Sequence, residues 1–285
     1  DAGKAIALMA KQDISIWELE DVGDNWTRAD AGGIAPIVAV PTTAGTGSEV
    51  GRASVILDEV AKVKKIIFHP KMVPAIVILD PMVTTGLPPM LTAATGMDAL
   101  SHSLEAWCSP AYHPMAEGIA VEGIRLVREY LPTAVASGSD VEARTQMLVA
   151  SMMGATAFQR GLGAMHALAH PLGALYNAHH GTLNAVLMPY VLIANRQAIE
   201  PRIIHLARSI DIPNASFDSF LEWVLALRET VSIPQNLEDL GIDDNQADLI
   251  GKMAEVDPSG GTNPILFDAS QYQSIFMNAL NGNLR

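Results

Sequence analysis

The chain has 285 residues, of which 49% are hydrophobic and 17% charged, and its formal net charge is −13. This composition is typical of a globular protein with one large domain or two modest ones. No apolar run reaches the roughly 18 residues of a membrane span, and no basic block offsets the acidic balance, which argues against membrane and nucleic acid as main partners. A single cysteine, Cys108, excludes an internal disulfide and a cysteine-based zinc site. It fits a reducing compartment, so we expect a cytoplasmic protein.

The first 80 residues predict short strands and one short helix. The apolar run 4–10 indicates the helix. Runs rich in β-branched residues, each flanked by Gly, Pro or charged residues, indicate strands at 36–40, 53–57, 64–68 and 75–79. This mixture predicts a small α/β unit. Four short strands make only a small sheet, which fits either a small α+β domain or a sheet of which part is absent.

From about Pro88 onward a helical period takes over. Segment 116–131 is amphipathic, and similar segments follow at 142–158, 163–176, 184–195, 201–209, 217–230, 245–254 and 269–280. Pro and Gly punctuate them, among them Pro189. No β-rich run of comparable strength returns. We therefore predict an α/β remnant over residues 1–82 and an all-helical domain over residues 83–285.

Two segments concentrate the residues with chemical potential. The first, TGMDALSHSLEAW at 95–107, places Asp98 and His102 four residues apart, so on a helix both project from one face. Glu105 lies three residues further on and could continue that face.

The second segment, at 165–181, repeats this spacing with His166 and His170 and ends in the pair His179 and His180. Neighbouring residues on a helix point about 100° apart, so only one of that pair can face an ion bound by the other histidines. We expect the three remaining histidines, His69, His113 and His205, to lie in loops, at helix starts or in structural positions.

A carboxylate with several imidazoles suits iron(II) or zinc. Spacing alone leaves a structural role open for each pair, but together the two segments favour a metal site. The second pair lacks the Glu of H-E-x-x-H, which argues against a zinc protease.

The segment PTTAGTGSE, at 41–49, follows the first predicted strand. Its glycines and hydroxyl side chains could approach a phosphate or a nucleotide. A strand-to-hairpin turn is an equally good interpretation, because neither a G-x-G-x-x-G nor a Walker A pattern is present.

The segments PTTAGTGSE, ATGMDALSHSLEA and HALAHPLGALYNAHHG, in this order, closely resemble signatures of the iron-containing (group III) alcohol dehydrogenase family. The resemblance covers essentially the whole chain. It implies a dehydroquinate-synthase-like fold of the α/β plus all-α class, with a partial N-terminal α/β domain followed by a helical metal-binding domain.

The resemblance also implies the roles of the histidine segments. One divalent ion would be held by the residues that match the family's ligands, namely Asp98, His102, His166 and His180. His170 would lie beside the reacting centre as the catalytic residue. The expected ion is iron(II), with zinc or another divalent ion as the alternative.

NAD or NADP is the cofactor that the resemblance implies. Thr42, Thr43 and Lys64 match cofactor contacts, and Asp1 begins the family's Asp-Ala-x-Lys helix start. The family's glycine-rich pyrophosphate turn precedes that start and is absent here. We therefore expect this chain to keep the metal but to bind the nicotinamide cofactor more weakly than a longer relative. Polar cofactor contacts common in relatives are also replaced, by Gly51 and Ala53.

These features predict an alcohol dehydrogenase or aldehyde reductase that transfers hydride between a metal-activated small alcohol and nicotinamide, in a homodimer. One alternative is a polyol dehydrogenase or a dehydroquinate-synthase-like lyase on the same fold. Another is a truncated, non-catalytic protein that binds a metal or dimerises.

Overall fold

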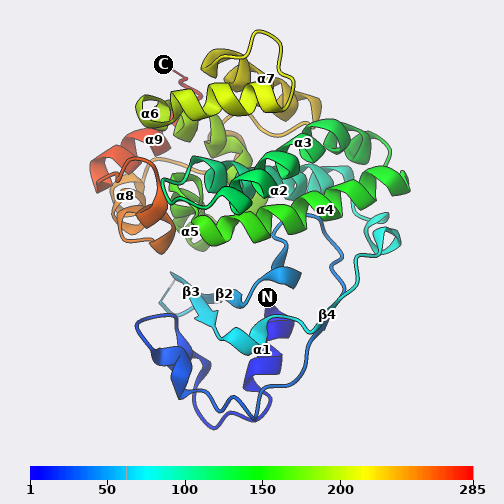
Figure 1. The fold of residues 1–285 in the computed structure, drawn as a ribbon. Coiled ribbons are helices and arrows are strands. Elements are labelled where there is room, and N and C mark those ends of the chain that lie inside the picture. The colour runs from blue at the N-terminus through cyan, green and yellow to red at the C-terminus, as the bar shows by residue number, and fades with distance from the viewer. Residues whose placement is uncertain (62, 285) are drawn as a thin grey trace.

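The computed structural model describes residues 1–61 and 63–284 and contains two parts of different composition (Figure 1). A small part with short strands, drawn at the bottom of Figure 1, ends near residue 80. A larger part, made of helices from residue 89 onward, lies above it. The predicted order, a partial α/β unit followed by helices, is therefore observed.

The strands form two small sheets, so the single sheet predicted from the sequence is wrong. β1 (Val38–Ala39) pairs in parallel with β4 (Ile76–Val77), and β2 (Ala53–Asp58) pairs antiparallel with β3 (Val63–Phe68). The Asp58 side chain accepts hydrogen bonds from the N–H groups of residues 60 and 61, which turns the chain back on itself. Such a short connection joins antiparallel strands and cannot join parallel ones.

The small part has its own hydrophobic core. α1 (Ala2–Met9) contributes Leu8, and β3 contributes Ile67, and both pack with Leu19 and Met72. A second and much larger core fills the helical part. The buried residues of this larger core begin at Ala93 in the chain, and Ala44 of the loop after β1 also packs against them.

Helices α3, α4 and α6 pack against α2, which is buried along most of its length, and the other helices of the larger part pack mainly against α6 and against one another. Their bounds, in chain order, are α2 (Pro89–Cys108), α3 (Pro114–Ala136), α4 (Val141–Ala157), α5 (Ala164–Tyr176), α6 (His180–Ser209), α7 (Phe217–Thr230), α8 (Ala247–Glu255) and α9 (Ala269–Asn281). Side-chain caps set several of these starts, including Asp140 for α4 and Asp268 for α9. Within the described residues, no helix combines the length and hydrophobicity needed to cross a bilayer.

Two segments that the sequence predicts as separate helices belong to one helix in the structure. The segments 184–195 and 201–209 both lie in α6, which continues through Pro189 and Pro201. Each proline removes one backbone hydrogen bond, yet α6 packs along α2, α5 and α7, and burial of that face outweighs the local cost. The predicted separation of the segments 184–195 and 201–209 is therefore wrong.

Candidate metal centre and active site

Helix α2 supplies Asp98 and His102 from its buried interior. Asp98 is only 4% exposed and His102 3% exposed, and Oδ2 of the aspartate lies 3.9 Å from Nδ1 of the histidine. The four-residue spacing therefore does place both side chains on one face, as expected from the sequence. This face looks toward the starts of α5 and α6.

Helix α5 brings His166 against His102. Their Nε2 atoms lie 3.1 Å apart, and their rings are 4.7 Å apart between centroids. His166 is buried, and its other ring nitrogen, Nδ1, lies 2.6 Å from Oε2 of Glu105 on α2. The imidazole is therefore held between a carboxylate on one side and a second imidazole on the other.

The start of α6 separates the two neighbouring histidines. His179 is the N-cap residue of α6, is exposed, and accepts a hydrogen bond from the Thr182 N–H through Nδ1. His180 points inward, with Nε2 3.8 Å from Oδ1 of Asp98. One member of the pair thus caps the helix while the other faces the buried cluster.

Asn184, one turn after His180, lies at the centre of this cluster. Its Nδ2 atom is 2.9 Å from Oδ1 of Asp98 and 3.2 Å from Nε2 of both His166 and His180. The candidate ligand atoms of Asp98, His102 and His166 all lie within 4.8 Å of one another. Three of the four residues predicted as ligands therefore form one buried group, and His180, whose side chain is 29% exposed, adjoins it through Asp98 and Asn184.

The charge states of the group suit a cation. Burial alone would raise the pKa of Asp98, but the imidazoles of His102, His180 and His166 and the hydrogen bond from Asn184 hold that pKa at about 2. Burial lowers the pKa of His166 and His180 well below the usual value. Near neutral pH the cluster thus offers an ionised carboxylate at Asp98 and neutral imidazoles at His166 and His180, which are the forms that bind metals.

The donor set fits a divalent transition metal. Imidazole nitrogen and carboxylate oxygen are the donors that iron(II) and zinc accept. With metal–nitrogen bonds of about 2.0–2.1 Å, adjacent ligand atoms stand roughly 3.0–3.4 Å apart. The 3.1 Å between the Nε2 atoms of His102 and His166 falls in this range.

His170 lies one turn after His166 on α5 and forms a second pair with an acid. Its Nδ1 is 2.8 Å from Oδ2 of Asp257, and its ring stacks on that of His180 at 5.6 Å between centroids. Burial would raise the pKa of Asp257, but the hydrogen bond from His170 and the Ser259 N–H keep that pKa below its usual value. An ionised carboxylate only accepts, so the Nδ1 proton stays on His170 and Nε2 is left free to take up a proton.

The four residues predicted to bind the cofactor are not gathered in one place. Thr42, Thr43 and Asp1 line a hollow of about 530 Å³ beside the loop after β1. The Asp1 carboxylate is already engaged there, since it accepts hydrogen bonds from the Ser48 hydroxyl and from the Val55 N–H.

Lys64 lies on β3 and lines a different hollow, of about 330 Å³, together with His170 and Asp257. Burial lowers the pKa of Lys64, while the charges of Asp98 and Asp257 act in the opposite direction. Its position among these groups places the ammonium beside the histidine cluster rather than beside the threonines.

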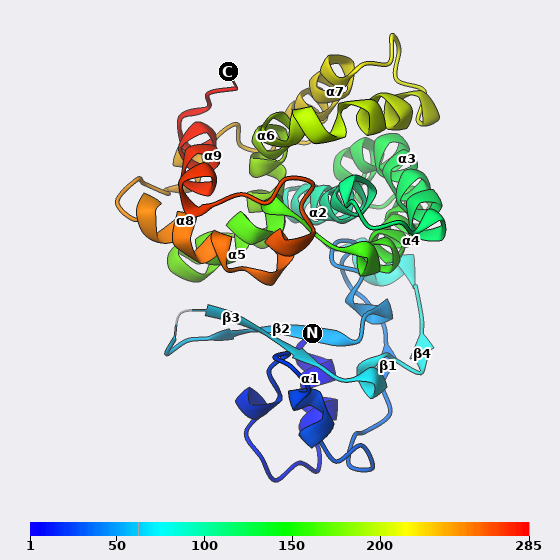
Figure 2. The same cartoon turned by 60° about the vertical axis from the view of Figure 1, so that its left-hand side comes forward.

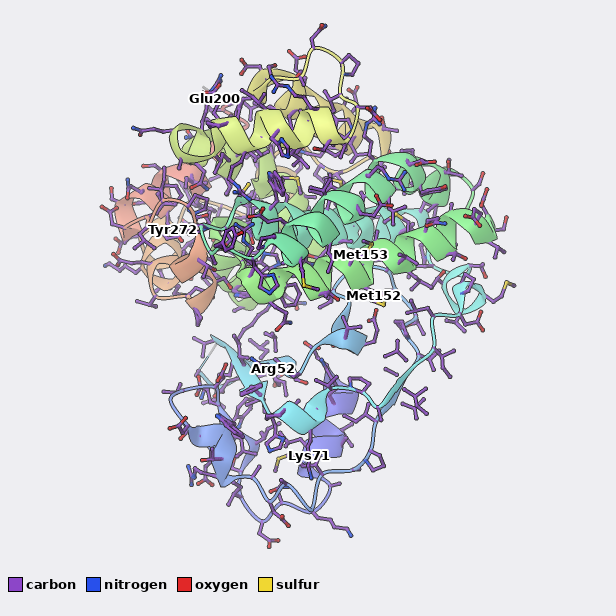
Figure 3. All side chains as sticks on the ribbon, in the orientation of Figure 1. Arg52, Lys71, Met152, Met153, Glu200 and Tyr272 are labelled. Carbon is purple, nitrogen blue, oxygen red and sulfur yellow. The ribbon has the colours of Figure 1, made fainter. Side chains whose placement is uncertain are left out.

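A third hollow, of about 400 Å³, links the other two. It shares Asp1 with the threonine hollow and His170 with the lysine hollow, and His102 and His166 also line it. The β2–β3 hairpin, seen below α5 in Figures 1 and 2, forms its opposite wall. Arg52, labelled in Figure 3, lies on this side of the small part and faces the helices.

The three histidines outside the two histidine-containing segments have local structural partners. His69 accepts a hydrogen bond from the Lys71 N–H, His113 caps the start of α3, and His205 stacks on Trp107. These positions agree with the loop, helix-start and structural positions predicted for them.

Two polar residues of the site, Asn184 and Asp257, were not predicted from the sequence, whereas Glu105 was placed on the face of Asp98 and His102 without a role. Glu105 and Asn184 each lie on the helical face of a predicted ligand, three and four residues after His102 and His180. That spacing was an available signal. Asp257 is 87 residues from His170, and nothing local in the sequence joins the two.

Comparison with known proteins identifies the class of this fold and site. Residues 92–280 match the C-terminal part of the Fe-containing alcohol dehydrogenase family, and residues 1–81 match iron-containing alcohol dehydrogenase. Alcohol dehydrogenase 4 of Saccharomyces cerevisiae is 37% identical over 282 residues, which cover 98% of this chain and 72% of the yeast protein.

Solved structures agree. A 1,3-propanediol oxidoreductase matches with a TM-score of 0.90 at 35% identity, covering 97% of this chain and 73% of that one. Sulfoacetaldehyde reductase from Bifidobacterium kashiwanohense, solved in complex with NAD+, matches with a TM-score of 0.86 at 30% identity, covering 97% and 72%. These neighbours confirm the predicted fold class and support an oxidoreductase of the alcohol dehydrogenase type. The chain belongs to the iron-containing alcohol dehydrogenase family.

Proposed function

We propose that this chain interconverts a small primary alcohol and its aldehyde, using one divalent metal ion and NAD or NADP. The ion is held by Asp98, His102, His166 and His180, and iron(II) is the first candidate, with zinc as the alternative. The observation that carries the proposal is the buried group of Asp98, His102 and His166, with His180 next to it, beside the His170–Asp257 pair.

A bound divalent ion supplies Lewis-acid polarisation of the alcohol oxygen, and a bound nicotinamide supplies the hydride acceptor. The protein contributes the geometry around them. Asp98 contributes one negative charge. Together with a +2 ion it would leave the site with a net positive charge, which favours a negatively charged oxygen nearby. Apolar side chains on the same hollow, Phe158 and Leu162, suit a short aliphatic substrate.

His170 moves the proton. Asp257 keeps the proton of the resting imidazole on Nδ1, so Nε2 can accept the proton released from the alcohol hydroxyl. The positive charge that then develops on His170 is stabilised by the Asp257 carboxylate 2.8 Å away. Asp257 therefore acts as a positioning residue for His170.

The cofactor is proposed to lie along the three adjoining hollows. Thr42 and Thr43 line one end and Lys64 the other, so an extended dinucleotide can contact both ends while its nicotinamide lies near His170. The ammonium of Lys64 would stay close to the reacting end. We further propose that the protein is a homodimer, which sedimentation of the purified chain would test.

The test uses the full chain, purified metal-free and loaded anaerobically with iron(II) or with zinc. We expect one ion per chain by elemental analysis and reduction of NAD or NADP with short primary alcohols. His170→Ala should keep the ion and lose most of the turnover, by about 100-fold or more. His205→Ala is the control, because this histidine stacks on Trp107 away from the cluster.

Two results would contradict the proposal in different ways. A loaded chain that binds one ion but neither binds nor reduces a nicotinamide cofactor would be a metal-binding protein without this activity. A chain whose ion survives His166→Ala and Asp98→Ala together would have its metal elsewhere.

A further inference from the structure

Glu105 on α2 is a buried carboxylate whose partners all come from the start of another helix. It is 4% exposed. Its Oε1 accepts a hydrogen bond from the Met165 N–H at 2.7 Å, and its Oε2 accepts one from the Gly163 N–H at 2.8 Å. Oε2 also lies 2.6 Å from Nδ1 of His166. The proposed mechanism gives this acid no role.

The start of α5 depends on these contacts. A helix leaves its first backbone N–H groups without partners, and the N-cap residue of α5, Gly163, has no side chain to satisfy them. Glu105 accepts hydrogen bonds from two of these N–H groups, and Oδ1 of Asn263 accepts one from a third, the Ala164 N–H, at 3.1 Å. A Cβ on Gly163 would lie 3.0 Å from Oε1 of Glu105 and 2.8 Å from Oδ1 of Asn263, so only glycine allows this approach.

The same carboxylate selects the form of His166. Burial raises the pKa of Glu105 to about 7, against the backbone N–H groups of Met165 and Gly163, which lower it. A neutral imidazole carries one proton, and above that pH the Glu105 carboxylate, which lies at Nδ1 of His166, holds this proton on Nδ1. The lone pair is then on Nε2, which faces His102 and Asn184 inside the cluster. Only in this form can His166 donate electrons to an ion bound there.

We propose that Glu105 is a positioning residue for the metal centre: it fixes the tautomer and ring orientation of His166 and ties the first turn of α5 to α2. The inference rests on the proposed metal site. Through its contacts, Glu105 joins α2, which carries Asp98 and His102, to α5, which carries His166. One side chain therefore sets the distance between these two parts of the site. Carboxylates that hold a ligating imidazole in this way change metal affinity by about 10- to 100-fold when removed.

The first experiment needs neither a metal nor a variant of Glu105. Nitrogen-15 spectra of histidine side chains in the metal-free wild-type chain, assigned with His166→Gln, report which ring nitrogen carries the proton. We expect His166 to carry it on Nδ1. A proton on Nε2 of His166 overturns the proposal, whatever the chain does with metals.

The second experiment compares Glu105→Gln with a matched control, Glu117→Gln. Glu117 is a part-buried carboxylate that pairs with Arg160 at 2.8 Å and Arg202 at 3.1 Å, so its loss perturbs the fold elsewhere. Glutamine at position 105 keeps the shape, but its amide nitrogen must face either the Met165 N–H or the donors at Oε2. One set of hydrogen bonds is then lost.

The readouts are zinc affinity, by competition with a chromophoric chelator, and the visible spectrum of the cobalt(II)-substituted chain, which reports ligand geometry. We expect Glu105→Gln to weaken zinc binding about 10- to 100-fold and to alter the cobalt spectrum, with Glu117→Gln unchanged in both. Equal zinc affinity and an identical cobalt spectrum in Glu105→Gln, or equal losses in the two variants, overturn the proposal. A wild-type chain that binds no zinc refutes the proposed metal site instead, and the His166 tautomer still decides the role of Glu105.

Discussion

Gly181 is the point at which α6 touches α2, directly after His180. A Cβ built on this glycine would lie 2.3 Å from the carbonyl oxygen of Ala94 and 3.1 Å from Cβ of Asp98. No side chain fits between the two helices there. Gly181→Ala must therefore push the start of α6 away from the helix that carries Asp98.

The size of the displacement follows from these distances. Ordinary contact begins near 3.4 Å, so the helices must separate by about 1 Å, whereas metal–nitrogen bonds are only about 2.0–2.1 Å long. We expect zinc affinity to fall at least 10-fold, by about the factor that small misplacements of a site cost. Overpacking should also lower the free energy of unfolding by about 1–3 kcal/mol, more than the roughly 1 kcal/mol that alanine gains over glycine in a helix.

The assay pairs zinc affinity with urea denaturation of the metal-free chain, and the control is Gly118→Ala in α3. Gly118 is exposed, and no atom of the described residues outside its own turn of helix lies within 4 Å of the place a methyl group would take. Alanine there should raise the free energy of unfolding by about 0.5–1 kcal/mol and leave the zinc affinity unchanged. Unchanged zinc affinity in Gly181→Ala would show that the close approach of α6 to α2 does not set the spacing of the ligands.

The histidine pair, a buried arginine and the acid sensitivity of the cluster give three more tests. His180→Ala should remove the bound ion while His179→Ala keeps it, as elemental analysis of the two variants would show; the reverse result would mean that the exposed capping histidine is the ligand. Arg228, 1% exposed, donates to the carbonyls of Pro234 and Gln235, so Arg228→Met should cost on the order of 3 kcal/mol in urea denaturation. Arg125→Met, at the surface, should change the same free energy by less than about 0.5 kcal/mol, and similar losses in both would refute the role of burial. Burial lowers the pKa of His166 and His180, so in the metal-free chain their contribution to stability is complete above about pH 6.5 and is lost as pH falls below it. Denaturation curves between about pH 7.5 and 5 should show this loss, and a double variant with asparagine at both positions should show less of it.

The sequence is most informative where function depends on spacing within one helix. Asp98 with His102, and His166 with His170, are predicted to share helical faces because residues four apart must do so, and the structure has this arrangement. The rule that neighbours diverge likewise predicts that only one of His179 and His180 faces inward.

Contacts between distant segments could not be predicted in this way. Glu105 meets His166 across 61 residues, and Asp257 meets His170 across 87. Each pairing depends on how whole helices pack, which no local periodicity encodes. Lys64 lines a different hollow from Thr42 and Thr43. This separation likewise follows from the turn of the β2–β3 hairpin.

Errors in the predicted fold have the same origin. Proline disfavours a helix locally, and the sequence predicts separate helices over 184–195 and 201–209, but α6 continues through Pro201 because its buried face extends on both sides of that residue. The four strands are alike in composition, which favours grouping them in one sheet. Which strands pair depends on the turn at Asp58, whose side chain closes the β2–β3 hairpin.

The lone thiol, Cys108, lies at the end of the buried stretch of α2 that contains the proposed ligands Asp98 and His102. Burial raises the pKa of its thiol to about 12, so the reactive thiolate is almost absent while the helix is packed. A thiol reagent can therefore react only during the moments when the end of α2 opens. The rate of that reaction counts these openings, and an ion that bridges α2 to its neighbours should make them rarer. The rate at which Cys108 is modified therefore reports the local opening of α2, the helix on which the proposed metal centre depends.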